Sequence, residues 1–500
     1  MSDGLLHQAE WVRVETMIGL DQSAQSAQSQ YFTPERAAEL IAALPKLPMV
    51  DSVRVLDPGA GSGILTAAIV ERICREQQVG QIEVVAVELD PNLLPALSKT
   101  AALCEEHGKH TGIHVRVKVV HGDVIALQTG LEAGLGDDFD LVIMNPPYKK
   151  LAAISWQRRA LAAMGWDTGN LYAAFVALGV DSLRPGGQLV AITPRSFANG
   201  PYFEQFRKRL LCQVGFDRIH TFESRSTVFA DTGVLQENIV FSATKGAKPG
   251  LVAITSSRDH MGELNERVIA YADLVSPDDP HQFIRITTND TDDDAVRTIE
   301  SLPCSLAGLD VEVSTGRVVD FRALPNLQGT PKPDSVPLIY PGNLRGGKVL
   351  WPRSIGKAQG FRLLDASDSK VLLPSGYYVL VRRFSAKEER RRIVAAVWDP
   401  TQHNGQPVAF ENHLNVFHAD GAGLDRELAW GLCAWLNSSV VDRYFRTFSG
   451  HTQVNATDLR SMNYPDENTL RQLGYGLDEL PEQEDLDDLV GQMTLEPVTI

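Results

Sequence analysis

The residues Asn145, Pro146, Pro147 and Tyr148 form the stretch with the clearest chemical potential in this chain. An asparagine side-chain oxygen and the carbonyl oxygen before a rigid proline can each accept a hydrogen bond from one NH2 group. The tyrosine ring offers a flat face on which another ring could stack. The stretch therefore suits the binding of a planar amine, although paired prolines also occur in ordinary loops.

The elements that must position this stretch are predicted by the apolar pattern upstream. Residues 139–144 form an apolar run that is typical of a buried parallel strand, so Asn145 would lie at the carboxyl end of that strand, where open α/β sheets bind ligands. Residues 53–56 predict another strand that ends in the glycine-rich loop Asp57–Gly63, and residues 64–74 have helical spacing. The loop lacks the G-x-G-x-x-G spacing, which disfavours a dinucleotide such as NAD.

Two further predicted strands each lead to a carboxylate. Residues 82–87 precede Glu88, which could accept both ribose hydroxyls of an adenosine. Residues 115–120 precede Asp123, which could accept from an adenine amino group while Val124 packs on the ring. Either carboxylate alone could be a solvated strand end, but their order along the chain favours a nucleotide-cofactor site.

With these motifs in this order, the chain resembles the S-adenosylmethionine-dependent methyltransferases, specifically the DNA adenine-N6 group with the gamma motif order. The resemblance covers about residues 30–245 and includes the segments 30–35, 170–175 and 183–194. It implies an α/β fold with a Rossmann-like methyltransferase sheet, and it implies S-adenosyl-L-methionine as the cofactor.

The resemblance also implies roles for single residues. Asn145, Pro146, Pro147 and Tyr148 would be catalytic, and Tyr148 and Phe229 would stack on the extruded base. Thr33 is expected to cap a helix that begins at Pro34 and, in the family, lies in a segment that contacts the methionine end of the cofactor. The cofactor-binding residues implied by the match are Thr33, Asp57, Pro58, Gly59, Ala60, Gly61, Gly63, Glu88, Asp123 and Val124.

The length of 500 residues predicts more than one domain. We expect an N-terminal segment and linker (1–30), a catalytic domain (31–248), a mixed α+β domain that recognises the DNA target (249–475) and an acidic C-terminal tail (476–500). Five scattered cysteines without metal-ligand spacing, and the lack of a leader or a long apolar run, predict a cytoplasmic protein without a metal. No Pro-Cys element accompanies the glycine-rich loop, which excludes covalent cytosine-C5 chemistry.

The distribution of charge decides whether a nucleic acid is a plausible partner. The net charge of -16 argues against one, but residues 311–460 hold 19 basic and 14 acidic residues, a local net charge of +5. Residues 450–460 are similar to the corresponding run in type II modification methylases of the PstI/BsuBI kind. Interleaved carboxylates make a solvated, salt-bridged surface the alternative. The candidate DNA-binding residues are Arg382, Arg383, Arg390, Arg391, Arg392, His451, Thr452, Gln453 and Asn455.

Together these features predict a site-specific methyltransferase that modifies N6 of a flipped adenine in duplex DNA, as the modification enzyme of a restriction-modification or related defence system. Because no convincing nuclease constellation is present, a separate cognate restriction endonuclease is a further expected partner. The alternatives are an RNA or protein-glutamine amino methyltransferase, a cytosine-N4 DNA methyltransferase, and a DNA-binding subunit of a defence complex. The sequence specifies neither the recognition site nor the oligomeric state.

Overall fold

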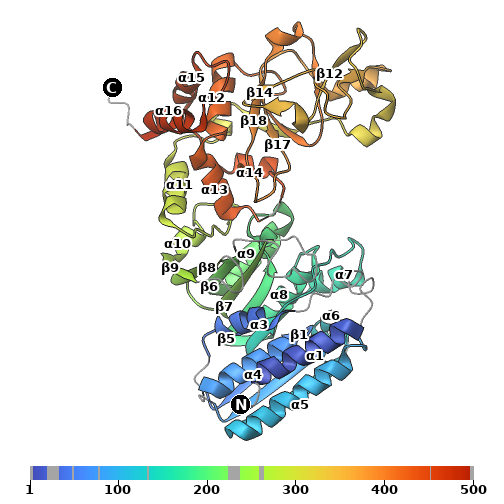
Figure 1. The fold of residues 1–500 in the computed structure, drawn as a ribbon, viewed down its shortest axis with the longest axis vertical. Coiled ribbons are helices and arrows are strands. Elements are labelled where there is room, and N and C mark those ends of the chain that lie inside the picture. Colours follow the sequence, from blue (N-terminus) through green and yellow to red (C-terminus); the bar gives the residue numbers. More distant parts are fainter. Residues whose placement is uncertain are drawn as a thin grey trace. The chain divides into compact units, whose positions relative to one another are not determined.

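A computed structural model describes residues 4–19, 33–47, 50–76, 79–131, 134–222, 237–257, 264–450 and 452–495. The chain divides into two compact units, Met1–Thr288 and Asn289–Ile500 (Figure 1). The first unit contains both the glycine-rich loop and the Asn-Pro-Pro-Tyr stretch, so it holds the predicted catalytic site.

The first unit is built on a nine-stranded sheet with the order β3-β2-β1-β4-β5-β7-β6-β8-β9. The first five strands along the chain run parallel, β7 is antiparallel to both β5 and β6, and β8 is parallel to β6 and antiparallel to β9. This arrangement confirms the predicted α/β methyltransferase sheet. The strands are β1 (Ser52–Pro58), β2 (Gln81–Glu88), β3 (His114–His121), β4 (Phe139–Met144), β5 (Leu183–Pro194), β6 (Val214–Phe222), β7 (Asn238–Lys245), β8 (Leu251–Ser257) and β9 (Asn265–Ala270).

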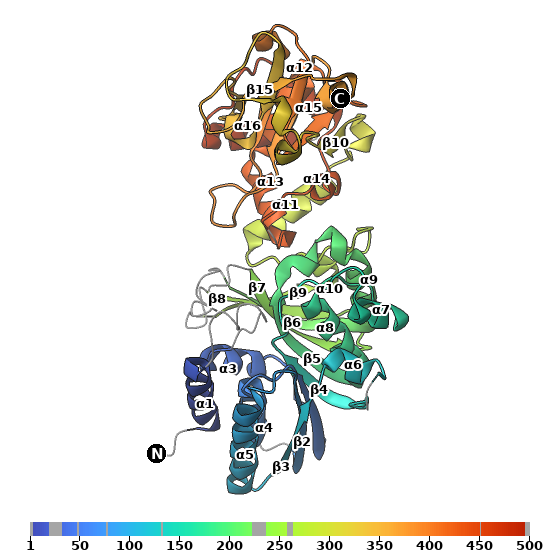
Figure 2. The same ribbon diagram turned by 90° about the vertical axis from the view of Figure 1, so that its right-hand side faces the viewer.

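Helices cover both faces of this sheet (Figure 2). One core joins the sheet to α1 (Leu5–Gly19), α3 (Glu35–Ala43), α4 (Ile64–Glu76) and α5 (Leu94–Thr111). The other joins it to α6 (Val124–Gln128), α7 (Trp156–Ala163), α8 (Leu171–Ser182) and α9 (Glu204–Gln213).

Alternation along the central strand β4 explains why its whole length is apolar. Leu141 and Ile143 face the first core, whereas Val142 and Met144 face the second. Side chains of a strand point alternately to the two faces, so a strand covered on both faces needs apolar residues at every position. The continuous run that the sequence shows at 139–144 is the consequence.

Two predicted boundaries of the catalytic unit differ from the structure. Residues 249–288 were assigned to the second domain, but β8 pairs with β6 inside the catalytic sheet, and Ile284 and Ile286 are buried in the same core. At the other end, α1 packs against α4 and α5, so the N-terminal segment is part of the catalytic unit.

The second unit is mixed α+β, as predicted. It contains a six-stranded sheet with the order β10-β20-β17-β18-β14-β13 and a five-stranded sheet with the order β11-β15-β12-β19-β16. Its strands are β10 (Glu312–Thr315), β11 (Leu327–Gln328), β12 (Ser335–Ile339), β13 (Leu344–Arg345), β14 (Lys348–Val349), β15 (Gly360–Arg362), β16 (Leu372–Leu373), β17 (Tyr378–Arg382), β18 (Ala395–Trp398), β19 (Val408–Phe410) and β20 (Leu414–His418). Its helices are α11 (Asp290–Ser301), α12 (Arg426–Leu436), α13 (Ser439–Phe448), α14 (Ala456–Arg460), α15 (Glu467–Gly474) and α16 (Gln483–Leu495), and the remaining short helix α10 (Tyr271–Leu274) belongs to the first unit.

The acidic C-terminal region is a packed helix and not a tail over most of its length. Leu486 and Val490 of α16 are buried, and the helix contacts α12, α13 and α15. The carboxylate of Asp487 accepts hydrogen bonds from the backbone N–H and the hydroxyl of Ser439, at the first turn of α13. The acidic composition therefore marks the solvent-facing side of an amphipathic helix.

Candidate active site

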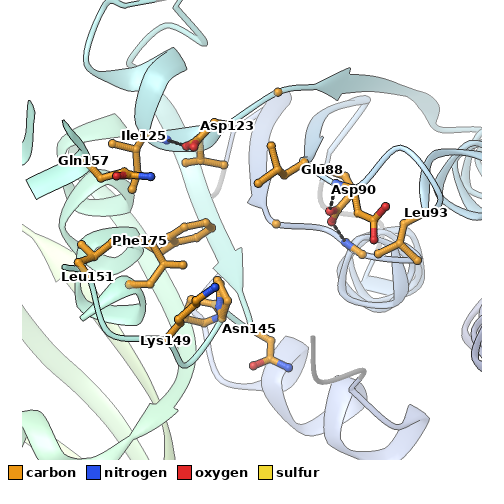
Figure 3. A pocket seen from close by; sticks show the side chains of 18 of the residues that line it. Glu88, Asp90, Leu93, Asp123, Ile125, Asn145, Lys149, Leu151, Gln157 and Phe175 are labelled. Carbon is orange, nitrogen blue, oxygen red and sulfur yellow. Dashed lines mark hydrogen bonds between the residues drawn. The ribbon is translucent and has the colours of Figure 1, made fainter. Parts of the chain in front are cut away.

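A cavity of about 620 Å³ opens where β1, β2, β3 and β4 end (Figure 3). The sheet order reverses between β1 and β4, and ligands of open α/β sheets bind outside the strand ends at such a switch point. Several of the residues predicted from the sequence meet there. They are Gly59, Gly61, Glu88, Asp123, Val124, Asn145, Pro146 and Pro147.

The glycine-rich loop is held against the neighbouring strand in a conformation that requires glycine. The backbone N–H groups of Gly59 and Ala60 donate to the Val87 carbonyl at 2.9 and 2.8 Å. Gly59 has φ +78°, and a Cβ there would lie 3.2 Å from the Phe175 ring. A larger residue would therefore strain the backbone and crowd the Phe175 ring, which lines the cavity.

The Glu88 carboxylate is fixed on the cavity wall by two backbone amides. Gly61 N–H donates to Oε2 and Asp90 N–H donates to Oε1, both at 2.8 Å. Only 7% of the residue is exposed, and burial raises the pKa of its carboxyl group. Each carboxylate oxygen has a further lone pair, so a fixed Glu88 can accept two more hydrogen bonds from a ligand.

Asp123 has a structural contact in addition to its place on the cavity. It is the N-cap of α6, where its Oδ1 accepts from the Ile125 N–H at 2.8 Å. The second oxygen, Oδ2, takes no part in that bond. Val124 and Ile125 line the cavity beside it, so a flat ring bound there would meet apolar side chains next to a carboxylate.

Asp57, Pro58, Ala60 and Gly63 are not among the residues that line the cavity. Asp57 is 1% exposed, and its Oδ2 accepts from the Thr66 hydroxyl at 2.7 Å. Burial raises the pKa of its carboxyl group to about 7. Asp57 therefore links the start of the glycine-rich loop to α4, away from the cavity.

Asn145 is held by the side chain of Thr33, from a distant segment, and by that of Tyr148, from its own stretch. Its Nδ2 donates to the Thr33 hydroxyl at 2.9 Å, and the Tyr148 hydroxyl donates to its Oδ1 at 3.3 Å. Thr33 is not the predicted helix cap, because α3 begins one residue later with Pro34 at the N-cap position and no side-chain cap. Instead, the buried Thr33 fixes which way the amide of Asn145 points.

Tyr148 stands at the start of a row of aromatic rings. Its ring meets Tyr172 edge-on at a centroid distance of 6.2 Å, and Tyr172 packs on Phe203 at 5.5 Å. The single hydrogen of the Tyr148 hydroxyl is shared between the Asn145 Oδ1 and the Ile192 carbonyl, which lies at 3.4 Å. The ring is half-buried and is not part of the cavity lining, so it borders the site beside Asn145.

The cavity also contains residues that the sequence analysis did not nominate. Lys149 and Lys150 directly follow the Asn-Pro-Pro-Tyr stretch, and Phe175 lies within the matched segment 170–175. The Leu151 N–H donates to the Gly169 carbonyl at 2.8 Å, which brings the two segments together. The two adjacent lysines beside the predicted catalytic stretch are the sequence signal that could have identified this part of the cavity lining. The remaining lining residues are Leu89, Asp90, Pro91, Leu93, Gly122, Ile125, Leu151, Ala152, Ser155, Gln157 and Leu171.

Comparison with known proteins identifies the family of this chain. Residues 106–229 match the family described as Eco57I restriction-modification methylase. The chain is 38% identical to the type II methyltransferase M.PstI of Providencia stuartii over 95% of its own length and 94% of that protein. It is 40% identical to the type II methyltransferase M.BsuBI of Bacillus subtilis over 89% of each chain. The chain belongs to the type II methyltransferases. This confirms the expected type II modification methylase and, with it, S-adenosylmethionine as the cofactor.

One solved structure reproduces the fold over nearly the whole chain. It is the type IIL restriction-modification enzyme MmeI in complex with DNA, which superposes with a TM-score of 0.56 and covers 99% of this chain and 74% of that one. With 12% sequence identity, the likeness concerns the fold alone.

Two nominated residues of the methyltransferase, Phe229 and His451, lie outside the described residues. Within the described ranges, no helix is long and apolar enough to cross a membrane, and no group of three or more potential metal ligands occurs.

Arg392 does not have the surface position expected of a DNA-contacting residue, and Asn455 is half-buried. Arg392 is 1% exposed, and its guanidinium donates to the hydroxyls of Ser385 and Ser449 at 3.1 and 3.0 Å. The Asn455 Nδ2 contacts Asp458 at 3.2 Å at the start of α14. The prediction that Arg392 contacts DNA is therefore wrong, because its side chain holds the interior of the second unit together.

The other nominated residues of the second unit reach its surface to differing degrees. Arg390 and Thr452 are exposed, whereas Arg382, Arg383, Arg391 and Gln453 are half-buried. The Arg383 Nη1 donates to the Asn412 carbonyl at 2.7 Å, which leaves the rest of its guanidinium next to the exposed ring of Phe384.

Proposed function

We propose that this methyltransferase modifies N6 of adenine in duplex DNA at a specific sequence. The observation that carries the proposal is the fixed amide of Asn145 at the edge of the cofactor cavity. Because its NH2 group donates to Thr33, its oxygen is the atom directed to a substrate amine. An amide oxygen has two lone pairs, so it can accept a substrate N–H as well as the long contact from Tyr148.

The cavity fits S-adenosylmethionine as the bound methyl donor. Glu88 would accept the ribose hydroxyls, and Asp123 with Val124 would hold the adenine ring. Gly59 and Gly61 allow the backbone to approach the cofactor closely. When bound, the cofactor supplies a methyl group activated by a positively charged sulfur.

The chemistry assigned to Asn145 and Pro146 is polarisation of the amine. The N6 lone pair of adenine is delocalised into the ring and is a poor nucleophile. If the Asn145 oxygen and the Pro146 carbonyl accept the two N6 hydrogens, the nitrogen is drawn toward tetrahedral geometry and the lone pair becomes available. No base is needed before the attack, because the proton becomes acidic only as the new bond forms. Catalysis is therefore mostly positioning.

An adenine inside a duplex must be flipped out before N6 can reach this site. Unpairing costs a few kcal/mol, and stacking of the base on Tyr148 would offset part of that cost. Phe229 is proposed as the second stacking ring on the basis of the sequence match alone. The second unit would then be the domain that recognises the DNA target.

The alternatives explain less of the chain. A protein-glutamine or RNA methyltransferase could use the same Asn-Pro-Pro-Tyr stretch, but the similarity to M.PstI extends over 95% of the chain and so includes the second unit. Cytosine-N4 enzymes usually begin the stretch with serine, whereas this chain has Asn145. The relatives M.PstI and M.BsuBI come from bacteria, where DNA lies in the cytoplasm, so we place the protein there. A separate cognate endonuclease is the further partner that we propose, because methylation of its recognition sequence would protect the cell's DNA from cleavage.

Base-resolved methylation mapping tests the proposal. DNA and RNA from cells that express the protein are compared with those from cells that express the Asn145→Ala variant. We expect N6-methyladenine at one short DNA sequence, present only with the unaltered protein. Methylation of cytosine N4, or of RNA with unmodified DNA, would refute the assignment.

A further inference from the structure

A small cavity in the second unit brings Arg443 of α13 together with Arg390 and Arg391 of the charge run. It has a volume of about 130 Å³ and lies between the segment that precedes β18 and the first turns of α13 and α16. Its lining residues are Arg390, Arg391, Ser439, Asp442, Arg443 and Gln483.

Hydrogen bonds between α13 and the segment that precedes β18 hold the arginines close together. Arg446 of α13 donates to the carbonyls of Lys387 and Glu389 at 2.7 and 2.9 Å, which fastens the Lys387–Arg390 segment to the helix. Asp442 accepts from the Arg446 Nε at 2.7 Å and from the Arg392 backbone N–H at 2.6 Å. This framework places Arg390 and Arg391 beside Arg443, which lies on the exposed side of α13.

The positive charge at this cavity exceeds the negative charge. Three arginines, Arg390, Arg391 and Arg443, line the cavity beside one carboxylate, that of Asp442, and the charges of Arg446 and Asp487 also act on Arg391. Asp442 is engaged by Arg446, and Asp487 is engaged by Ser439 and by Gln483 at 3.0 Å. In the parts of the chain that the structure describes, neither Arg390 nor Arg443 has a carboxylate within 4.0 Å.

The Arg391 guanidinium is the most buried of the three arginines that line the cavity. Its Nη1 donates to the Ser438 carbonyl at 3.3 Å. Burial lowers its pKa, Asp442 and Asp487 act in the opposite direction, and the charges of Arg390 and Arg446 lower it further. A partly buried cation among other cations is stabilised when an anion takes the remaining space.

We propose that this cavity binds one phosphate of the DNA backbone, with Arg390 and Arg443 donating to the phosphate oxygens. Guanidinium groups match the geometry of phosphate oxygens and form charge-assisted hydrogen bonds with them. Such a contact fixes the position of the duplex without reading its sequence. The inference rests on the proposed action on duplex DNA, and it replaces the buried Arg392 with Arg443 as the partner of Arg390.

The test is the salt dependence of duplex binding. Binding of a fluorescent duplex is titrated by anisotropy at several salt concentrations for the full-length protein and for Arg390→Ala/Arg443→Ala. The matched control is Arg297→Ala/Arg362→Ala, which removes the same charge from exposed arginines that are paired with Asp294 and Asp334. Thermal unfolding of each variant establishes that it folds.

One lost phosphate contact reduces the slope of log K against log salt by about 0.9. We expect that reduction in the cavity variant alone, with equal weakening for duplexes of different sequence. The variant Arg390→Lys/Arg443→Lys keeps the charge and should retain most of the slope. A slope that equals that of the unaltered protein in a folded cavity variant would overturn the proposal.

Inorganic phosphate distinguishes DNA from a free anion as the ligand. If phosphate raises the unfolding temperature of the unaltered protein but not of the cavity variant, while both bind DNA with the same slope, the cavity binds free anions and the proposal is wrong. If the unaltered protein methylates DNA and the slope does not change in the variant, only the cavity assignment fails. If the unaltered protein neither binds nor methylates duplexes, the proposed function fails and the cavity assignment fails with it.

Discussion

Replacing Thr33 with valine tests the proposed orientation of the Asn145 amide. The Thr33 hydroxyl accepts from the Asn145 Nδ2 at 2.9 Å, and Thr33 is 3% exposed. Valine has nearly the same shape but cannot accept a hydrogen bond. The amide of Asn145 would then lose the contact that keeps its NH2 group away from the substrate and its oxygen toward it.

The expected size of the effect follows from the strength of one hydrogen bond. A typical bond contributes about 0.5–1.5 kcal/mol, and each 1.36 kcal/mol of barrier is a factor of ten in rate. If that energy is lost only in the transition state, kcat should fall roughly 2- to 13-fold. The affinity for S-adenosylmethionine should hardly change, because the amide orients the substrate amine.

Single-turnover methylation at saturating cofactor and DNA measures the rate, and calorimetry measures cofactor affinity. Thr33→Ser keeps the hydroxyl and is the matched control, so it should recover most of the rate. The reasoning is refuted if Thr33→Val keeps the full rate, or if Thr33→Ser is equally impaired. A weaker cofactor affinity at unchanged rate would instead support the cofactor contact implied by the family resemblance.

Three other substitutions probe the same unit. Asn145→Ala should abolish transfer and leave cofactor binding largely intact, and turnover above a tenth of the original would exclude its role in polarising the amine. Glu88→Ala should weaken cofactor binding by roughly 1–3 kcal/mol, the cost of leaving ligand hydroxyls unpaired, and an unchanged affinity by calorimetry would contradict the ribose assignment. Burial raises the pKa of the Asp57 carboxyl group from 3.8 to about 7. Between these two pH values the folded protein keeps this proton and the unfolded chain has lost it. The contribution of Asp57 to the free energy of unfolding therefore falls as pH rises from about 4 to about 7. Asp57→Asn removes this pH dependence. The free energy of unfolding of the variant, measured with denaturant and compared with that of the unaltered protein, should therefore increase over this pH range and level off above it. A difference that does not vary with pH would show that Asp57 does not titrate there.

The sequence by itself determined the catalytic sheet and the place of the site. Continuous apolar runs predicted the parallel strands, and the strand ends predicted which residues would meet. Both signals are local, because a strand covered on two faces must be apolar throughout and glycines mark a tightly turning loop. Gly59, Glu88, Asp123 and Asn145 accordingly line one cavity.

Tertiary structure decided the contacts between distant segments. Thr33 has the sequence features of a helix cap, and only the fold shows that it holds Asn145, 112 residues away. Arg390, Arg391 and Arg392 are equivalent as a charge run, yet the framework around Asp442 buries Arg392 and leaves Arg390 at the surface. Charge and composition do not encode burial, because burial depends on which elements pack over a side chain. For the same reason the sequence did not reveal that β8 and β9 complete the sheet of the first unit, or that the acidic C-terminal region packs as α16.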